Sequence, residues 1–184
     1  MKKSCKKPRI YEAELESSFD LVLKEAEDLY QSEGRLKKTY GRLTRCLNEM
    51  GVSYTLIGGY ALIFHGVRRF TEDIDLLVSK EGLDRLHKGL IGRGYVQAAP
   101  GSRNLRDVDT GVQIEFTVSE THEGVKVIDL KSLIELKLVS GMTAKSRLQD
   151  LADVQRLIER HHLTAGFAEH LNPYVRNKFI ELLS

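Results

Sequence analysis

The chain has 184 residues, of which 41% are hydrophobic and 29% are charged, and its formal net charge at pH 7 is +2. This composition predicts a globular protein with a hydrophobic core and excludes a disordered or fibrous chain. A net charge of +2 is too small to indicate nucleic-acid binding by itself, and the longest apolar runs are far shorter than a membrane span. We therefore expect a single domain over residues 1–184 and no membrane association.

Residues 1–10 form a basic tail with five Lys and Arg side chains and no acidic one. We expect the tail to be solvated, and the alternative is that it adds salt-sensitive contacts to phosphates. No apolar stretch follows it, so no signal peptide is expected. The two cysteines, Cys5 and Cys46, provide neither a metal site nor a disulfide framework, which favours a cytoplasmic location.

The hydrophobic pattern predicts helices at both ends of the chain and a mixed core between them. Residues 11–50 show helical spacing that is interrupted near Gly34. In the core, residues 51–128, strands are expected at 53–57, 69–78, 95–97, 103–108, 112–118 and 125–128, and helices at 60–65 and 83–91. Residues 129–184 predict C-terminal helices, with N-caps at Asp129 and Asn172. These elements predict the α+β class, with a small mixed sheet and flanking helices.

The most informative stretch runs from a glycine pair, Gly58 and Gly59, to an acidic pair, Asp73 and Asp75. Side chains alternate along a strand, so the two aspartates share one face and lie ~6.6 Å apart along it. Two carboxylates held this close are unfavourable unless they are neutralised, and a hard divalent cation is the simplest neutraliser. A glycine pair before a helix lets the backbone approach a phosphate closely.

The order of these motifs resembles the signature of the DNA polymerase beta-type nucleotidyltransferase superfamily. That signature has a glycine pair, a helix-length interval and an Asp-x-Asp pair in a hydrophobic strand. The chain is similar to the small bacterial branch found as toxins of toxin–antitoxin and phage abortive-infection systems. The motifs that carry this second likeness are His65-Gly66, Arg69-x-Thr71 and Asp73-Ile74-Asp75-Leu76.

The resemblance implies an activity for the core over residues 51–128. This activity is the transfer of a nucleoside monophosphate from an NTP to a hydroxyl group, with release of pyrophosphate. The implied cofactor is Mg²⁺ or Mn²⁺. The implied acceptor is RNA (a tRNA end, for example), a protein hydroxyl or a small molecule, and an antitoxin is an implied partner.

The resemblance also implies a set of metal ligands. Asp73 and Asp75 would bridge two metal ions about 3.5–4 Å apart. Glu115 would complete the site from a neighbouring strand, where the family more often has aspartate. Residues 112–118 alternate between apolar and polar side chains, which puts Glu115 opposite the apolar face. The alternative for Glu115 is a solvent-facing strand residue, and we favour the ligand.

Two residues before the aspartates are candidates for nucleotide binding. Arg69 is expected to reach a phosphate, and the alternative is an ion pair with Glu72 or Asp73. Thr71 is expected to share the strand face of Asp73, from which its hydroxyl would bond a phosphate oxygen. Gly58 and Gly59 would offer backbone N–H groups to the triphosphate.

Lys137 lies among apolar residues of the helix expected at 130–140. Its ammonium group either extends to water or, as the resemblance implies, lies near the nucleotide phosphates. In the next helix, the projection that buries Leu148 also turns Arg147 and Asp150 toward the protein body. The two charges would form an i,i+3 ion pair that anchors the helix. In the functional alternative, Asp150 lies near the nucleophile or in a network that orients it.

Two other classes of function remain open at this stage. One is a module of the same fold that binds a nucleotide or a partner without catalysis. The other is a DNA- or RNA-binding protein that uses the basic tail, which the modest net charge does not favour. Mg²⁺-dependent NTP binding separates the first of these from the second, and turnover separates the enzyme from the inactive module.

Overall fold

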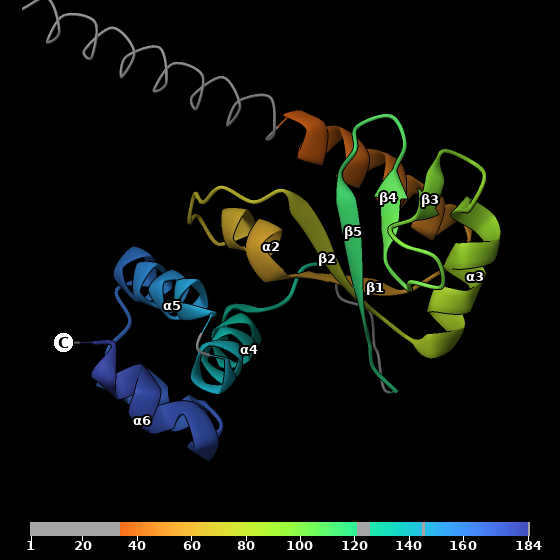
Figure 1. Cartoon of the computed structure of the whole chain (residues 1–184). Coiled ribbons are helices and arrows are strands. Elements are labelled where there is room, and N and C mark those ends of the chain that lie inside the picture. Colours follow the sequence, from red (N-terminus) through yellow and green to blue (C-terminus); the bar gives the residue numbers. More distant parts are fainter. Residues whose placement is uncertain (1–33, 121–125, 145, 184) are drawn as a thin grey trace, which may run out of the picture.

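A five-stranded mixed sheet with flanking helices forms the centre of the protein (Figure 1). The computed structural model describes residues 34–120, 126–144 and 146–183. A helix over residues 34–49 precedes the elements β1 Tyr54–Ile57, α2 Gly58–Phe64, β2 Asp73–Val78, α3 Lys80–Leu90, β3 Tyr95–Gln97, β4 Leu105–Asp107, β5 Gln113–Val118, α4 Leu130–Thr143, α5 Leu148–His161, the 3₁₀ helix η1 Ala165–His170 and α6 Pro173–Glu181. The predicted α+β class is confirmed. The basic tail and the first predicted helix lie outside the described residues.

The sheet order is β1-β2-β5-β4-β3, so the two central strands are not consecutive in the chain. β2 and β5 run parallel, and every other neighbouring pair is antiparallel. The chain crosses from β2 to β5 through α3 and the β3–β4 hairpin, as a parallel pairing requires. In the parallel register, Asp75 is opposite Glu115 and Asp73 is opposite Gln113.

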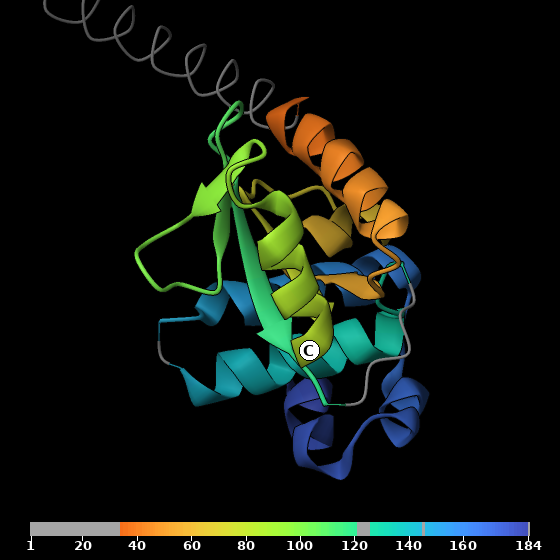
Figure 2. The same ribbon diagram turned by 90° about the vertical axis from the view of Figure 1, so that its right-hand side faces the viewer.

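One face of the two central strands is apolar and fully covered. Ile74 and Leu76 of β2, with Ile114 and Phe116 of β5, are buried. The helix over residues 34–49 and α3 lie side by side in both views, and His87 of α3 contacts the Phe116 ring (Figures 1 and 2). Because strand side chains alternate, this burial turns the polar side chains of both strands to the opposite face.

A buried polar cluster ties the helix over residues 34–49 to the end of β4. Thr39 donates a hydrogen bond of 3.0 Å to Asp107, and Arg42 forms an ion pair with the same carboxylate. Burial alone would raise the pKa of Asp107, but the hydrogen bonds from Arg42, the Thr110 backbone and Thr39 outweigh it and lower the pKa. This cluster therefore fixes the helix against the strand hairpin.

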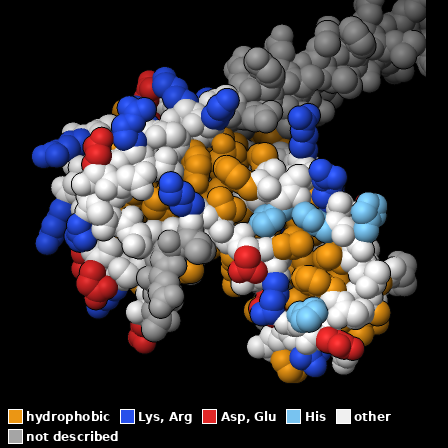
Figure 3. Space-filling view, turned by 180° about the vertical axis from the view of Figure 1, so that it is seen from behind, with side chains coloured by type: hydrophobic (Ala, Val, Ile, Leu, Met, Phe, Trp, Pro, Cys, Tyr) orange, Lys and Arg blue, Asp and Glu red, His pale blue; other side chains and the backbone are white. Residues whose placement is uncertain are grey.

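The C-terminal helices α4, α5 and α6 gather on the side of the molecule away from α3 and β3 (Figure 1). Two histidine contacts join them to the core: His65 binds the Ile128 carbonyl at 2.8 Å, and His161 binds the His65 carbonyl at 2.9 Å. From behind, histidine side chains separate two apolar areas of surface (Figure 3). No helix among the described residues has the length and apolar character needed to cross a bilayer.

Most element boundaries agree with the sequence, and two predictions are wrong. The predicted N-caps are confirmed, since Asp129 accepts from the Ser132 N–H and Asn172 from the Tyr174 N–H. The strand expected at 125–128 is reduced, in its described part, to an isolated bridge at Val127. The glycine pair, expected as a turn before a helix at 60, forms the first two residues of α2.

The orientation predicted for Arg147 and Leu148 at the start of α5 is also wrong, whereas Asp150 turns toward the protein body as predicted. The Arg147 side chain is 65% exposed and Leu148 is 68% exposed. Arg147 is the N-cap, with φ −107° and ψ 35°, so the helical projection does not apply to it. The buried stripe of α5 contains Val154 and Ile158, as predicted, together with Asp153 and Leu157.

Candidate metal centre

Three carboxylates from the two parallel strands converge on the polar face of the sheet. One ligand oxygen each from Asp73, Asp75 and Glu115 lies within 4.8 Å of the others. The parallel register places Asp75 beside Glu115, and the alternation of β2 places Asp73 two residues away on the same face. The structure thus brings together the three residues that were predicted as ligands.

This geometry suits a divalent cation. Opposite ligands of an octahedral Mg²⁺ ion lie ~4.2 Å apart, at twice the ~2.1 Å Mg–O bond. The observed limit of 4.8 Å is close to that span, so small side-chain rotations would bring all three oxygens into bonding distance. Carboxylate oxygen is also the ligand type that Mg²⁺ and Mn²⁺ prefer.

The electrostatics of the site centre on Asp75. Burial, followed by the charges of Asp73 and Glu115, raises the pKa of Asp75 from 3.8 to about 7. A hydrogen bond from the Gly59 backbone and the charge of Lys137 oppose this rise but do not cancel it. A carboxyl group in this state accepts either a proton or a cation, so the site is expected to exchange one for the other as pH rises.

This raised pKa predicts a pH-dependent stability in metal-free buffer. Between about pH 4 and pH 7 the folded protein keeps a proton on Asp75 that the unfolded chain has lost. The free energy of unfolding therefore falls as the pH rises through this range, by up to about 4 kcal/mol for a shift of about three pKa units. Urea unfolding with EDTA, at steps across the range, measures the slope.

Two comparisons isolate the contribution of Asp75. Asp75→Asn should flatten this part of the pH profile, and Mg²⁺ should restore stability at the alkaline end by binding the folded state. A wild-type profile identical to that of Asp75→Asn would show that the carboxyl group titrates at its ordinary pKa.

The glycine pair provides the space in which the Asp75 carboxylate lies. Gly58 has φ +67°, and a Cβ built on it would lie 1.8 Å from Asp75 Oδ2. A Cβ on Gly59 would lie 2.6 Å from an Arg69 guanidinium nitrogen and 2.7 Å from Thr71 Oγ1. Contacts within the protein thus explain why both positions are glycine. The Gly59 N–H, which was predicted to face a triphosphate, donates a hydrogen bond to Asp75.

Gly58→Ala tests this close approach. We expect the free energy of unfolding to fall by about 3 kcal/mol or more, since the alanine adds a carboxylate clash to the strain of a positive φ. Gly101→Ala is the matched control, because Gly101 has φ +73° and a Cβ added to it would lie in open space, with no contact within 4 Å. The control should lose only about 1–2 kcal/mol. If urea unfolding shows the same loss of stability in both variants, the contact with Asp75 does not explain the glycine at position 58.

The predicted nucleotide-binding residues Arg69 and Thr71 both have partners inside the protein. Thr71 is buried, precedes the first residue of β2, and donates a 2.7 Å hydrogen bond to Asp73 Oδ1. It therefore orients a candidate ligand from outside the strand, where it was expected to share the strand face. The Arg69 guanidinium lies 3.5 Å from Asp153. The alternative for Arg69, an ion pair with Glu72 or Asp73, does not form among the described residues.

Lys137 joins the two C-terminal helices through a buried ionic network. Its ammonium group lies 2.8 Å from Asp150 and 2.7 Å from Asp153, and the residue is only 5% exposed. The alternative in which the ammonium group extends to water is therefore wrong. Asp150 also accepts from Ser140 at 2.7 Å. Burial alone would raise the pKa of Asp150, but the hydrogen bonds from Lys137 and Ser140 lower it.

Asp150 stands apart from the carboxylate cluster. Among the described residues, the cluster that could hold a metal contains only Asp73, Asp75 and Glu115. Asp150 connects to it through Lys137, whose charge acts on Asp75. Its predicted ion pair with Arg147 is present only as a 3.9 Å contact at an exposed side chain.

Sequence reasoning assigned no role to Gln113, which positions a candidate ligand, or to Asp153, which holds the neighbouring cations. Gln113 donates from its side-chain amide to Glu115 at 2.8 Å, which orients the carboxylate from the same strand face. Gln113 lies two residues before Glu115, so the alternation of the strand already indicated that the two side chains share a face. Asp153 is fully buried between Lys137 and Arg69. Asp153 lies four residues before Leu157, and this helical spacing indicated that both face the buried side of α5.

Comparisons with known proteins add no relative to this picture. No protein-family model matches the chain. A search of curated proteins also finds no match. The assignment of a function therefore depends on the residues of the site.

Proposed function

We propose that the protein is a metal-dependent nucleotidyltransferase that moves a nucleoside monophosphate from an NTP to a hydroxyl acceptor. The observation that carries the proposal is the convergence of Asp73, Asp75 and Glu115 from paired parallel strands. The resemblance of the glycine and aspartate motifs to nucleotidyltransferases supports the same chemistry. In the reaction, the acceptor oxygen bonds the α-phosphorus, the bond to pyrophosphate breaks, and the hydroxyl proton passes to water.

The three carboxylates would hold Mg²⁺ or Mn²⁺, which neutralises phosphate charge and stabilises the entering and leaving oxygens. The remaining residues keep these carboxylates in place. Thr71 orients Asp73, Gln113 orients Glu115, and the Gly59 backbone holds Asp75. Hydrogen bonds of this kind to candidate ligands commonly tune metal affinity.

The positive charges beside the carboxylates suit a nucleotide phosphate. Lys137 and Arg69 both contact Asp153, and Arg69 also lies against Gly59. In the proposal, Lys137 acts mainly by setting the potential around Asp75, and Arg69, which is partly exposed, is the cation able to turn toward a phosphate. Asp150 acts as a positioning residue through Lys137.

Isotope transfer tests the proposed reaction directly. The purified protein is incubated with Mg²⁺, total cell RNA and protein, and each of the four NTPs labelled at the α-phosphate. We expect the label to enter a macromolecular fraction only when the metal is present. Label that enters from the γ-phosphate instead would identify a kinase and contradict the proposal, and NTP binding without transfer would identify an inactive module.

The resemblance extends the proposal to a cytoplasmic, toxin-like role with an antitoxin partner. Induced expression of the wild-type chain should then arrest bacterial growth, while Asp75→Asn should not. Growth arrest by both proteins at equal expression would show that the effect does not need the proposed site.

A further inference from the structure

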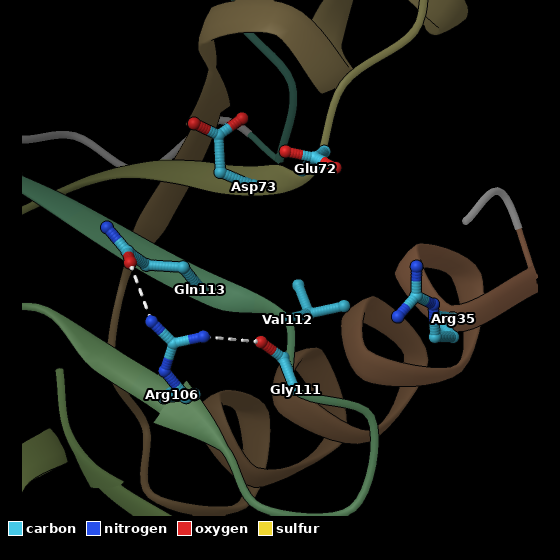
Figure 4. Close-up of a pocket in the computed structure, with 7 residues that line it drawn as sticks. All are labelled: Arg35, Glu72, Asp73, Arg106, Gly111, Val112 and Gln113. Atoms are coloured by element: carbon cyan, nitrogen blue, oxygen red, sulfur yellow. Dashed lines mark hydrogen bonds between the residues drawn. The ribbon is translucent and has the colours of Figure 1, made fainter. Parts of the chain in front are cut away.

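A pocket of about 360 Å³ opens beside Asp73 (Figure 4). Glu72 and Asp73 lie along one wall, at the start of β2. Arg106 of β4 lies across from them, and Arg35 reaches the pocket from the helix over residues 34–49. The pocket therefore has an acidic wall, which continues into the candidate metal centre, and two arginines on other sides.

The two arginines are available to a ligand. Arg106 donates to the Gly111 carbonyl at 3.1 Å and to the Gln113 side-chain oxygen at 3.3 Å. These bonds hold the guanidinium plane and leave further N–H donors free, since the group has five. The Arg35 side chain makes no hydrogen bond or ion pair among residues 34–120, 126–144 and 146–183.

Arg106 is also linked to the metal centre. Gln113 accepts from Arg106 through its side-chain oxygen and donates to Glu115 through its amide nitrogen. One glutamine thus fixes the guanidinium and a candidate metal ligand at the same time. This shared support gives the pocket and the carboxylate cluster a defined relative position.

The polarity of the pocket decides how a ligand would lie in it. The acidic wall repels an anionic group but accepts hydrogen bonds from hydroxyl groups. The arginines attract an anion and match the geometry of phosphate oxygens. A ligand with a phosphate at one end and a hydroxyl at the other satisfies both walls.

We propose that this pocket binds the terminal nucleotide of a nucleic-acid acceptor, with its phosphate at Arg35 and Arg106 and its hydroxyl group at Asp73. The inference rests on the proposed nucleotidyl transfer and names its acceptor. A volume of about 360 Å³ is at the lower end of small-molecule sites and accommodates one nucleotide. A serine, threonine or tyrosine of a protein acceptor would bring no phosphate to the two arginines.

Equilibrium binding of a short, fluorescently labelled single-stranded RNA tests the pocket without catalysis. Anisotropy is measured with Mg²⁺ and no NTP for the wild type, Arg35→Ala, Arg106→Ala and the double variant. Each single change should weaken binding about tenfold and lower the salt dependence by about one released ion. Arg45→Ala, exposed on the same helix as Arg35, and Arg93→Ala, exposed after α3, are the matched controls and should bind normally.

A parallel titration with NTP separates the acceptor pocket from the nucleotide site. Arg35→Ala should keep wild-type NTP affinity and an unchanged melting temperature, and Arg106→Ala, which also removes a support of Gln113, should lose more RNA affinity than NTP affinity. If they lose NTP affinity and keep RNA affinity, the pocket receives the triphosphate and the inference is overturned. Unchanged RNA binding in the double variant, or label transfer to protein alone, also overturns it.

The failure of this inference is distinguishable from failure of the proposed function. Loss of RNA binding in the arginine variants supports the pocket even if no NTP donates label, in which case only the transfer reaction is contradicted. Normal transfer to RNA by the double variant would support the proposed enzyme activity and contradict the role of the pocket. A deoxyribose-ended strand, compared with the ribose-ended strand, shows which kind of terminus the pocket accepts.

Discussion

Asp75→Asn is expected to abolish metal-dependent transfer and, at the same time, to stabilise the protein in metal-free buffer. The rate should fall by about 10³-fold or more, equivalent to about 4 kcal/mol of transition-state stabilisation, because the variant loses a central ligand charge. Stability should rise because burial, followed by the charges of Asp73 and Glu115, makes the charged form of Asp75 unfavourable and raises its pKa to about 7. Initial rates with α-labelled NTP and thermal unfolding with EDTA measure the two effects.

Neighbouring substitutions sharpen this expectation. Asp73→Asn should behave like Asp75→Asn, and Glu115→Gln should retain NTP binding while transfer falls by orders of magnitude. Glu115→Asp keeps the charge on a shorter side chain and should keep part of the activity. Asp84→Asn, on the exposed face of α3, is the control for removal of a carboxylate and should change neither rate nor stability.

Some outcomes would assign the acidic cluster a different role. A marked loss of stability in both Asp73→Asn and Asp75→Asn without metal would show that the carboxylates are structural. Normal turnover by Glu115→Gln would reduce the site to the two β2 carboxylates.

Lys137→Ala is expected to lower the free energy of unfolding by about 3–5 kcal/mol. The change removes the ammonium group from Asp150 and from Asp153, which is fully buried and keeps Arg69 as a cationic partner at 3.5 Å. The sequence alone suggests a loss of NTP affinity that exceeds the loss of stability. Because of the buried ion pairs, we expect the loss of stability to exceed the loss of NTP affinity. Urea unfolding at neutral pH measures the loss of stability.

Two comparisons separate the buried network from an ordinary ion pair. Lys178→Ala removes an exposed i,i+3 pair with Glu181 and should lower stability by less than about 1 kcal/mol. Adding Asp153→Asn to Lys137→Ala should recover part of the loss, because it removes a buried charge that has lost its closer cation. If Lys137→Ala instead unfolds like the wild type but binds NTP weakly, the ammonium group serves the nucleotide and not the helix pair.

The sequence by itself determined the elements and the local caps. The spacing of apolar residues predicted the α+β class, and the side chains of Asp129 and Asn172 cap the helices that follow them. The alternation of β2 also placed Asp73 and Asp75 on one face before any partner strand was known. These features depend on residues within a few positions of each other, so local backbone geometry is sufficient to predict them.

Only the tertiary structure decided which of these residues meet. Asp75 lies opposite Glu115 because β2 and β5 pair in parallel in one register, and a register is set by the packing of a whole sheet face. The pairing of Lys137 with Asp153 depends in the same way on the packing of α4 against α5. The pocket at Arg35 and Arg106 joins a helix, a strand and a turn that are distant in the chain. No local pattern encodes such contacts, because long-range packing selects them when the chain folds.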